Sequence, residues 1–244
     1  MGFLCGLAFW CNPIFSVWLV PMGISLVGMF RGTGKRSVLI GFSLGFLAGR
    51  VSFALFCIIA TFTVLYSAPP WRTKRLGLWA NFTIAVPRGC LVPVVGWSAV
   101  TSVWQIEPWY LGLTFFLYLL GASSSKDFAD APGDRACGIQ TLPVKYGARE
   151  AARIVTPFLG WPWLLIPLGA HNHWLSGDRT ALTVLGAALA AWGFYQGRLM
   201  LREPERLATE GNHISWKHMV LMLIAAPVGI AISYWLTGEP PGRE

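Results

Sequence analysis

The sequence is poor in charge, and the little charge that it has is unevenly distributed. Only 12% of its 244 residues are Asp, Glu, Lys or Arg, while 55% are hydrophobic and the mean hydropathy is +0.54. A soluble domain of this length would carry about twice that charged fraction. No acidic residue precedes Glu107. The composition therefore excludes a soluble globular protein.

Cysteine is scarce too, and its pattern excludes a disulfide framework. The five cysteines are odd in number and none form a metal-like pair, so we interpret them as small residues of a membrane core. The N-terminus lacks the basic stretch of a signal peptide, so the first apolar segment is expected to be retained. Alternating segments of about ten residues, as a transmembrane barrel requires, are also missing.

Long apolar runs are what the sequence does contain. Each is close to the ~20 residues that a helix needs to cross a bilayer, and lipid requires each run to satisfy its own backbone, which favours helices. We predict an all-α, multi-pass transmembrane helix bundle that forms one domain over residues 1–244. The predicted spans are seven: 5–29, 38–66, 76–102, 108–124, 151–170, 180–197 and 218–237.

The basic residues predict the orientation of this bundle. Loops 67–75, 125–150 and 198–217 together hold eleven Lys or Arg residues, against five on the opposite side. Cytoplasmic loops are enriched in Lys and Arg, so these three loops are predicted to be cytoplasmic. Topology then accounts for the net charge of +8, and no nucleic-acid partner is predicted.

An acidic segment follows the fourth predicted span. Asp127, Asp130 and Asp134 are spaced i, i+3, i+7, which places them within about 60° of one another on a helix. Three carboxylates on one face repel each other, and Mg²⁺ would compensate them, because it commonly joins one or two carboxylates to a substrate phosphate. Pro132 and Gly133 are expected to weaken the helix before Asp134. The alternative is a solvated acidic stretch that caps a helix end.

A basic loop on the same predicted side of the membrane separates two spans. In LYSAPPWRTKR (65–75), Tyr66 ends one predicted helix and three cations, Arg72, Lys74 and Arg75, lie close together. A diphosphate would need such cations and a hydroxyl donor for its outer oxygens. The alternative is that these cations serve only to hold the loop inside.

Taken together, the two loops resemble those of the UbiA-type intramembrane prenyltransferases. Segment 126–147, KDFADAPGDRACGIQTLPVKYG, resembles the second aspartate-rich motif of that family, and 66–75 resembles its Tyr-Ser-Pro-Pro…Lys segment. Segment 212–219 resembles a stretch before the last helix of some members. The resemblance covers about residues 60–237. The first aspartate motif of the family, Asn-Asp-x-x-Asp, has no counterpart here, and we expect a chain that is N-terminally shortened relative to the family by two helices.

The resemblance implies a function and a set of site residues. The implied reaction is Mg²⁺-dependent transfer of a polyprenyl group from a prenyl diphosphate to a hydrophobic acceptor. An aromatic quinone precursor is favoured by its frequency in the family, while chlorophyll-type and ether-lipid acceptors stay open. It would take place in a bacterial or archaeal cell membrane, at a site on the cytoplasmic side. The implied metal ligands are Asp127, Asp130 and Asp134, which also count as catalytic together with Tyr66 and Lys74. The implied diphosphate-binding residues are Arg72, Lys74, Lys126 and Arg135, and Asn81 and Arg88 are implied in the substrate chamber.

Three other functions stay open from the sequence. A phosphatidyltransferase acting on CDP-activated alcohols also uses aspartates at the membrane surface, but its longer aspartate pattern is missing. A catalytically silent protein that retains half of a prenyltransferase site is consistent with the missing first motif. A transporter would show paired, interrupted helices, which the sequence does not clearly contain. Asn81 has a structural alternative as well, a hydrogen bond between two helices.

Overall fold

The computed structural model describes residues 49–68, 71–98, 101–209 and 213–237, and these ranges contain helices and turns but no strand. The expected all-α fold is therefore confirmed for this part of the chain. The elements in chain order are α4 (Arg50–Ser67), η1 (Thr73–Arg75), α5 (Leu78–Ala85), the π-helix η2 (Val86–Leu91), α6 (Val92–Ser98), α7 (Ile106–Ala122), α8 (Ser124–Ala136), α9 (Leu142–Val155), α10 (Pro157–Gly160), η3 (Trp161–Leu164), α11 (Leu165–His171), α12 (Arg179–Arg202), α13 (Pro204–Thr209) and α14 (Ile214–Trp235).

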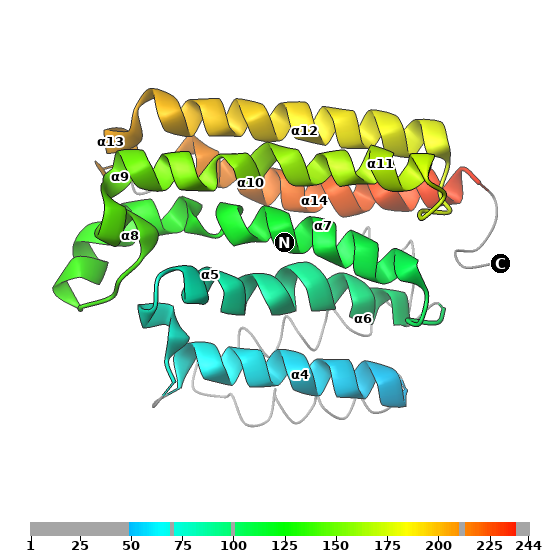
Figure 1. The fold of residues 1–244 in the computed structure, drawn as a ribbon, viewed down its shortest axis with the longest axis horizontal. Coiled ribbons are helices and arrows are strands. Elements are labelled where there is room, and N and C mark those ends of the chain that lie inside the picture. Colours follow the sequence, from blue (N-terminus) through cyan, green and yellow to red (C-terminus); the bar gives the residue numbers. More distant parts are fainter. Residues whose placement is uncertain (1–48, 69–70, 99–100, 210–212, 238–244) are drawn as a thin grey trace.

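The long helices lie side by side in a bundle (Figure 1). Helix α7 runs through its middle and packs against the α5–η2–α6 segment on one side and against α10 on the other. Helix α12 packs against α10, α11 and α14, while α4 packs against α5 and η2. Helix α8 and the turn η1 lie at the same end of the bundle (Figure 1). The loops that the sequence singles out are thus brought to one end.

The apolar helices only partly reproduce the predicted spans. Leu78–Ser98 and Ile214–Trp235 are long and apolar enough to cross a membrane, and the bent pair Leu142–Val155 and Pro157–His171 would make a third. These correspond to predicted spans 76–102, 218–237 and 151–170. The prediction of seven spans is not confirmed, because by length and composition the described residues provide two such helices, or up to three. Predicted span 5–29 lies outside the described residues.

Two local expectations need correction. The described part of predicted span 38–66 is helical from Arg50 onward, and Gly49, with a φ of 125°, precedes the helix. Arg50 therefore lies at a helix start and not near the middle of a span. Helix α8 does not end before Asp134, since it continues through Pro132 to Ala136. Pro132 is exposed, so water can satisfy the carbonyl that loses its amide partner.

Glycines allow α12 to pack closely on the bent pair. A Cβ at Gly193 would lie 1.9 Å from the carbonyl oxygen of Leu159, and one at Gly186 would lie 2.3 Å from Cδ of Pro167. Small residues let helix backbones approach in this way inside membranes, where the hydrophobic effect does not drive helices together. This packing fixes the half of the bundle that supports α8 and α9.

Candidate active site

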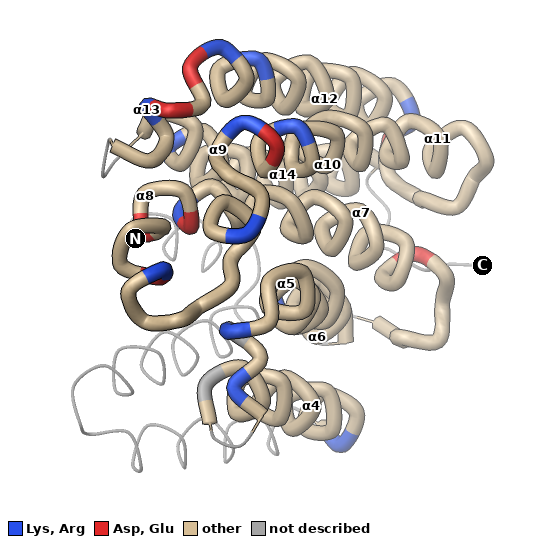
Figure 2. The backbone as a smooth tube through the Cα atoms, turned by 60° about the vertical axis from the view of Figure 1, so that its left-hand side comes forward, with Lys and Arg blue, Asp and Glu red and all other residues tan. Residues whose placement is uncertain are grey.

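The acidic and basic loops touch directly. The amide of Gln140, in the segment after α8, donates to the carbonyl of Arg75 at 3.4 Å. Gly77 follows the basic turn with a φ of +57°, and a Cβ there would lie 2.8 Å from the carbonyl oxygen of Gln140. Figure 2 shows charged residues of α8 and of the turn between α4 and α5 at this end of the bundle. The two loops therefore lie against each other at one end of the bundle.

Asn81 connects the helices that carry these loops. It is buried on α5, and its Nδ2 donates to the carbonyl of Leu120 at 3.0 Å and to Oγ of Ser124 at 2.6 Å. Ser124 in turn makes a side-chain hydrogen bond with Asp127. The helix-to-helix bond considered for Asn81 is thus present, and the same residue supports a predicted metal ligand.

The three predicted carboxylates share one side of α8. Burial first, and then the negative charges of Asp134 and Asp130, raise the pKa of Asp127 to about 7. Asp134 is half-buried and its Oδ2 accepts a hydrogen bond from Oγ1 of Thr141 at 3.4 Å. Asp130 is exposed. Like charges that compete in this way favour binding of a cation.

Tyr66 lies in the last turn of α4 and is half-buried. Its hydroxyl is within electrostatic reach of Asp127 and Asp134 on α8, and of Arg88 on η2. Tyr66 therefore lies between groups of opposite charge that come from two other elements. A phenol in this position can donate a hydrogen bond to an anion held beside the carboxylates.

The predicted cations lie in the basic turn and on α8. Arg72 has a left-handed backbone with a φ of 36°, and its buried Nε has no hydrogen-bond partner among the residues that the structure describes. Lys74 lies in η1, but its side chain is outside the described part of the structure. Lys126 is exposed and its charge acts on Asp127, and Arg135 is exposed in the last turn of α8. An unpartnered guanidinium nitrogen in a strained turn leaves a donor available to a ligand.

Arg88, the second predicted chamber residue, lies in the π-helix η2. Its side chain is exposed, whereas its neighbours Pro87 and Gly89 are buried. Arg88 makes no hydrogen bond or ion pair with any residue that the structure describes. A π-helical turn inside an α-helix frequently marks a functional position.

The carboxylate oxygens of this site are donors of the kind that Mg²⁺ prefers. Among the described residues, no three His, Cys, Asp or Glu side chains converge closely enough to enclose a metal ion by themselves. Mg²⁺ does not require such a cage, since one or two carboxylates and the phosphates of a substrate are its usual ligands. Asp127 and Asp134 interact electrostatically, and a carboxylate pair of this kind suits a magnesium ion shared with a diphosphate.

Sequence reasoning missed the residues that position the carboxylates. Ser124 joins Asn81 to Asp127, and Thr141 joins the segment after α8 to Asp134. Both hydroxyls lie close to the aspartates in the sequence, which was a usable signal. The bond between Ser124 and Asn81 was not predictable, because Asn81 comes from a different helix.

Comparison with known proteins identifies the family. The UbiA prenyltransferase family matches residues 34–210. The chain is 30% identical over 214 residues to the bacteriochlorophyll synthase 34 kDa chain of Chloroflexus aurantiacus, covering 87% of this chain and 67% of that protein. It is 30% identical over 202 residues to digeranylgeranylglyceryl phosphate synthase of Methanothermobacter thermautotrophicus, covering 82% and 67%. The chain thus spans about two thirds of the length of these relatives.

A solved structure reported for a digeranylgeranylglyceryl phosphate synthase has the same fold. The match has a TM-score of 0.63 at 21% identity, and it covers 84% of this chain and 68% of that one. Proteins of the family are integral to membranes and transfer prenyl groups to acceptors. The resemblance drawn from the two loops is confirmed: this chain belongs to the UbiA prenyltransferase family.

Proposed function

We propose that this chain transfers a polyprenyl group from a prenyl diphosphate to a hydrophobic acceptor, an aromatic quinone precursor or a similar lipid-pathway acceptor, at a site on the cytoplasmic side of the membrane. The observations that support the proposal are the contact between the two loops and the electrostatic interaction of Asp127 and Asp134 with the hydroxyl of Tyr66. Family membership supports the reaction type.

In the proposed reaction, charged and polar groups bind the leaving diphosphate, and apolar helix faces protect the allylic cation. The allylic carbon–oxygen bond breaks, and the diphosphate leaves with the electron pair. Arg72, Lys74, Lys126 and Arg135 are the cations assigned to its oxygens, and Tyr66 donates a hydrogen bond to it. The acceptor then forms a bond to the allylic carbon and loses a proton. Apolar helix faces exclude the water that would otherwise capture the cation.

Asp127, Asp130 and Asp134 are the residues assigned to Mg²⁺. The ion would supply positive charge that stabilises the departing diphosphate. The three carboxylates also repel one another when no cation is bound. This repulsion disfavours the state in which all three are ionised. Ser124 bonds Asp127 and Thr141 bonds Asp134. Hydrogen-bonding groups behind metal ligands commonly orient the ligands in this way.

The test is an assay of the purified protein in lipid nanodiscs with geranylgeranyl diphosphate, Mg²⁺ and a panel of phenolic acceptors. Prenylated product and free diphosphate are both measured. Asp127→Asn and Asp134→Asn should each lower the rate about 100-fold or more, because each removes a charge that acts on the transition state. Glu205→Gln is the control, since Glu205 is an exposed acid on α13 without an ion pair among the described residues.

Two outcomes contradict the proposal. Diphosphate release that continues at the same rate in Asp127→Asn and Asp134→Asn would remove the aspartates from the site. No release from the unaltered protein with any acceptor would favour the alternative of a catalytically silent member of the family.

A further inference from the structure

A charged side chain inside a membrane span requires a partner. Arg88 lies within Leu78–Ser98, one of the helices long and apolar enough to cross the membrane, and within the described residues it has no hydrogen bond or ion pair. Ionisable residues at such depth are costly and usually face a cavity or a binding site. Three features of the local structure indicate where Arg88 is directed and what it is suited to bind.

The first feature is the backbone around Arg88. The amide of Val92 donates to the carbonyl of Pro87, five residues earlier, which defines a π-helical turn. Gly89 packs so closely on α7 that a Cβ there would lie 2.5 Å from Cα of Phe116. The wide turn keeps Gly89 in the interface with α7 while Arg88 next to it remains exposed. The backbone is therefore arranged to keep this side chain out of the helix packing.

The second feature is the direction of the side chain. Asn81 and Gly89 both contact α7, so the exposed Arg88 is turned away from that interface. Helix α4 packs against η2, and the charge of Arg88 reaches the hydroxyl of Tyr66 at the end of α4. Arg88 thus faces the candidate active site.

The third feature is its depth. Arg88 is ten residues after Leu78, the first residue of α5, so its backbone lies about 15 Å from the loop end of the helix. The cations assigned to the diphosphate come instead from the turn before α5 and from α8. Arg88 is therefore farther from the loop end than these cations, on the side from which a hydrophobic acceptor would come out of the membrane.

We propose that Arg88 binds an anionic group, a carboxylate or a phosphate, on the acceptor, so that this protein selects acceptors that are acidic as well as hydrophobic. This inference rests on the proposed function. A guanidinium is suited to either anion because it presents paired donors in a plane. The bond would hold the acceptor at a fixed depth, with its reacting atom towards Tyr66.

The experiment uses two matched pairs of acceptors with geranylgeranyl diphosphate in nanodiscs. One pair is an aromatic carboxylic acid, 4-hydroxybenzoate, and its methyl ester; the other is a monoalkylglycerol phosphate and the uncharged monoalkylglycerol. The two pairs separate a carboxylate from a phosphate as the preferred group. Binding of each acceptor is also measured by thermal shift without the donor, so the result does not depend on turnover.

The unaltered protein should bind the charged member of one pair at least tenfold more tightly than the uncharged member. Arg88→Gln should raise KM and Kd for that charged acceptor about tenfold to hundredfold, as expected for a lost hydrogen bond between charged groups, and leave KM for the prenyl diphosphate within about threefold. Arg88→Lys should restore part of the preference. Arg50→Gln is the control, because Arg50 is exposed at the start of α4.

Each contrary result has a distinct meaning. A rise in KM for the prenyl diphosphate with no change for the acceptor would overturn the inference and place Arg88 in the diphosphate site. Equal binding of charged and uncharged acceptors, or a preference that Arg88→Gln leaves intact, would overturn it as well. If the unaltered protein releases no diphosphate but still binds acidic acceptors through Arg88, the proposed function fails and the binding site stands.

Discussion

Asn81 and Ser124 are 43 residues apart in the sequence, and Nδ2 of Asn81 donates to Oγ of Ser124 at 2.6 Å. The same amide donates to the carbonyl of Leu120 at 3.0 Å, so one side chain of α5 binds both the end of α7 and the start of α8. Because Ser124 also bonds Asp127, the orientation of a candidate magnesium ligand depends on an amide that belongs to another helix.

Replacing Asn81 should therefore affect both stability and metal use. Asn81→Ala removes two buried hydrogen bonds and should lower the free energy of unfolding by about 1–3 kcal/mol. The Mg²⁺ concentration for half-maximal activity should rise about tenfold or more, as for other groups that orient metal ligands. Thr63→Ala is the control, since among the described residues that hydroxyl bonds only the carbonyl of Ile59 in its own helix. If the Mg²⁺ dependence does not change, Asn81 contributes to helix packing only and does not orient the metal ligand.

The raised pKa of Asp127 predicts how ligand binding depends on pH. Burial and the charges of Asp134 and Asp130 raise this pKa to about 7 in the absence of metal. Mg²⁺ binds the ionised carboxylate and so competes with the proton. The affinity for Mg²⁺ with inorganic pyrophosphate should increase from pH 6 to pH 8. Calorimetry in two buffers with different ionisation enthalpies should detect proton release near pH 7, and no release would contradict the assignment.

The same pKa predicts a gain in stability when the charge is removed. Between about pH 4 and pH 7 the folded protein binds a proton at Asp127 that the unfolded chain has lost, so the stability from this group falls as the pH rises. Asp127→Asn keeps the shape without the charge. It should have a higher Tm than the unaltered protein at pH 8, with the difference shrinking towards pH 4, while losing activity. A lower Tm at pH 8 would show that the carboxylate stabilises the fold.

Gly77 offers a way to separate the two loops. Gly77 and Gly138 both have positive φ, at +57° and +68°, but only a Cβ at Gly77 would clash, with the carbonyl of Gln140 at 2.8 Å, whereas Gly138 has open space. Both alanine variants carry backbone strain of about 1–3 kcal/mol, because a Cβ is disfavoured at positive φ. Gly77→Ala should in addition lower kcat/KM for the prenyl diphosphate at least tenfold. Equal losses in the two variants would show that the loop contact is not needed.

Much of this arrangement was predictable from the sequence because the relevant signals are local. The spacing of Asp127, Asp130 and Asp134 placed the carboxylates on one side of a helix, and the motif spacing identified the family correctly. Predicted spans 76–102 and 218–237 coincide with apolar helices, because hydropathy is a property of each segment by itself. The continuation of α8 through Pro132 was not predicted, since the penalty of proline depends on exposure.

Features that depend on contact between distant segments were beyond sequence reasoning. The Gln140–Arg75 bond and the position of Ser124 require the packing of α5 on α7. The π-helical turn at Arg88 likewise depends on how Gly89 meets Phe116. Glycine allows close approach at many places in such a chain, and only the fold shows which of them is used.

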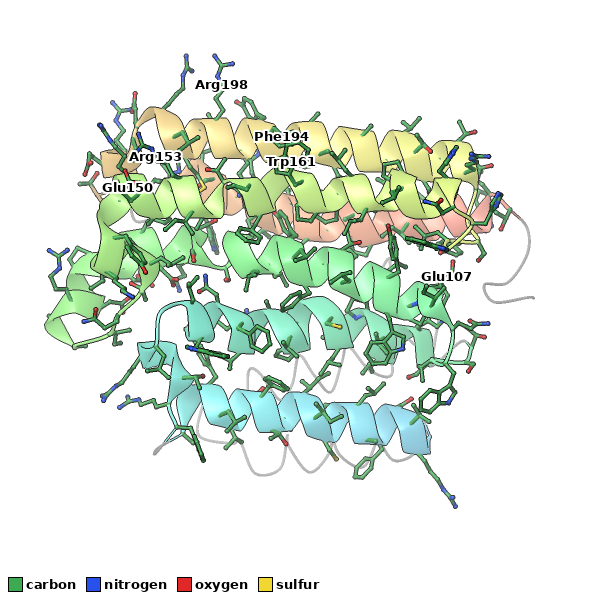
Figure 3. All side chains as sticks on the ribbon, viewed as in Figure 1. Glu107, Glu150, Arg153, Trp161, Phe194 and Arg198 are labelled. Carbon is green, nitrogen blue, oxygen red and sulfur yellow. The ribbon has the colours of Figure 1, made fainter. Side chains whose placement is uncertain are left out.

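Glu107, the first acidic residue of the sequence, has a role that sequence reasoning did not anticipate. It lies at the end of α7 opposite to α8 (Figure 3) and is 6% exposed. Its carboxylate accepts hydrogen bonds from the amide of Ser176 at 2.6 Å, from the hydroxyl of Ser176 at 3.0 Å and from the hydroxyl of Tyr234. It thereby joins α7, the loop before α12 and α14.

This cluster should contribute to stability and not to catalysis. Glu107→Ala leaves the buried donors of Ser176 and Tyr234 unpaired and should lower the free energy of unfolding by about 3 kcal/mol. Glu107→Gln retains one acceptor oxygen and should lose less. Below the unfolding temperature kcat should stay within about twofold of the unaltered value, because the candidate site lies at the other end of the bundle. A large fall in kcat in a variant that circular dichroism shows to be fully folded would mean that the two ends are coupled through α7.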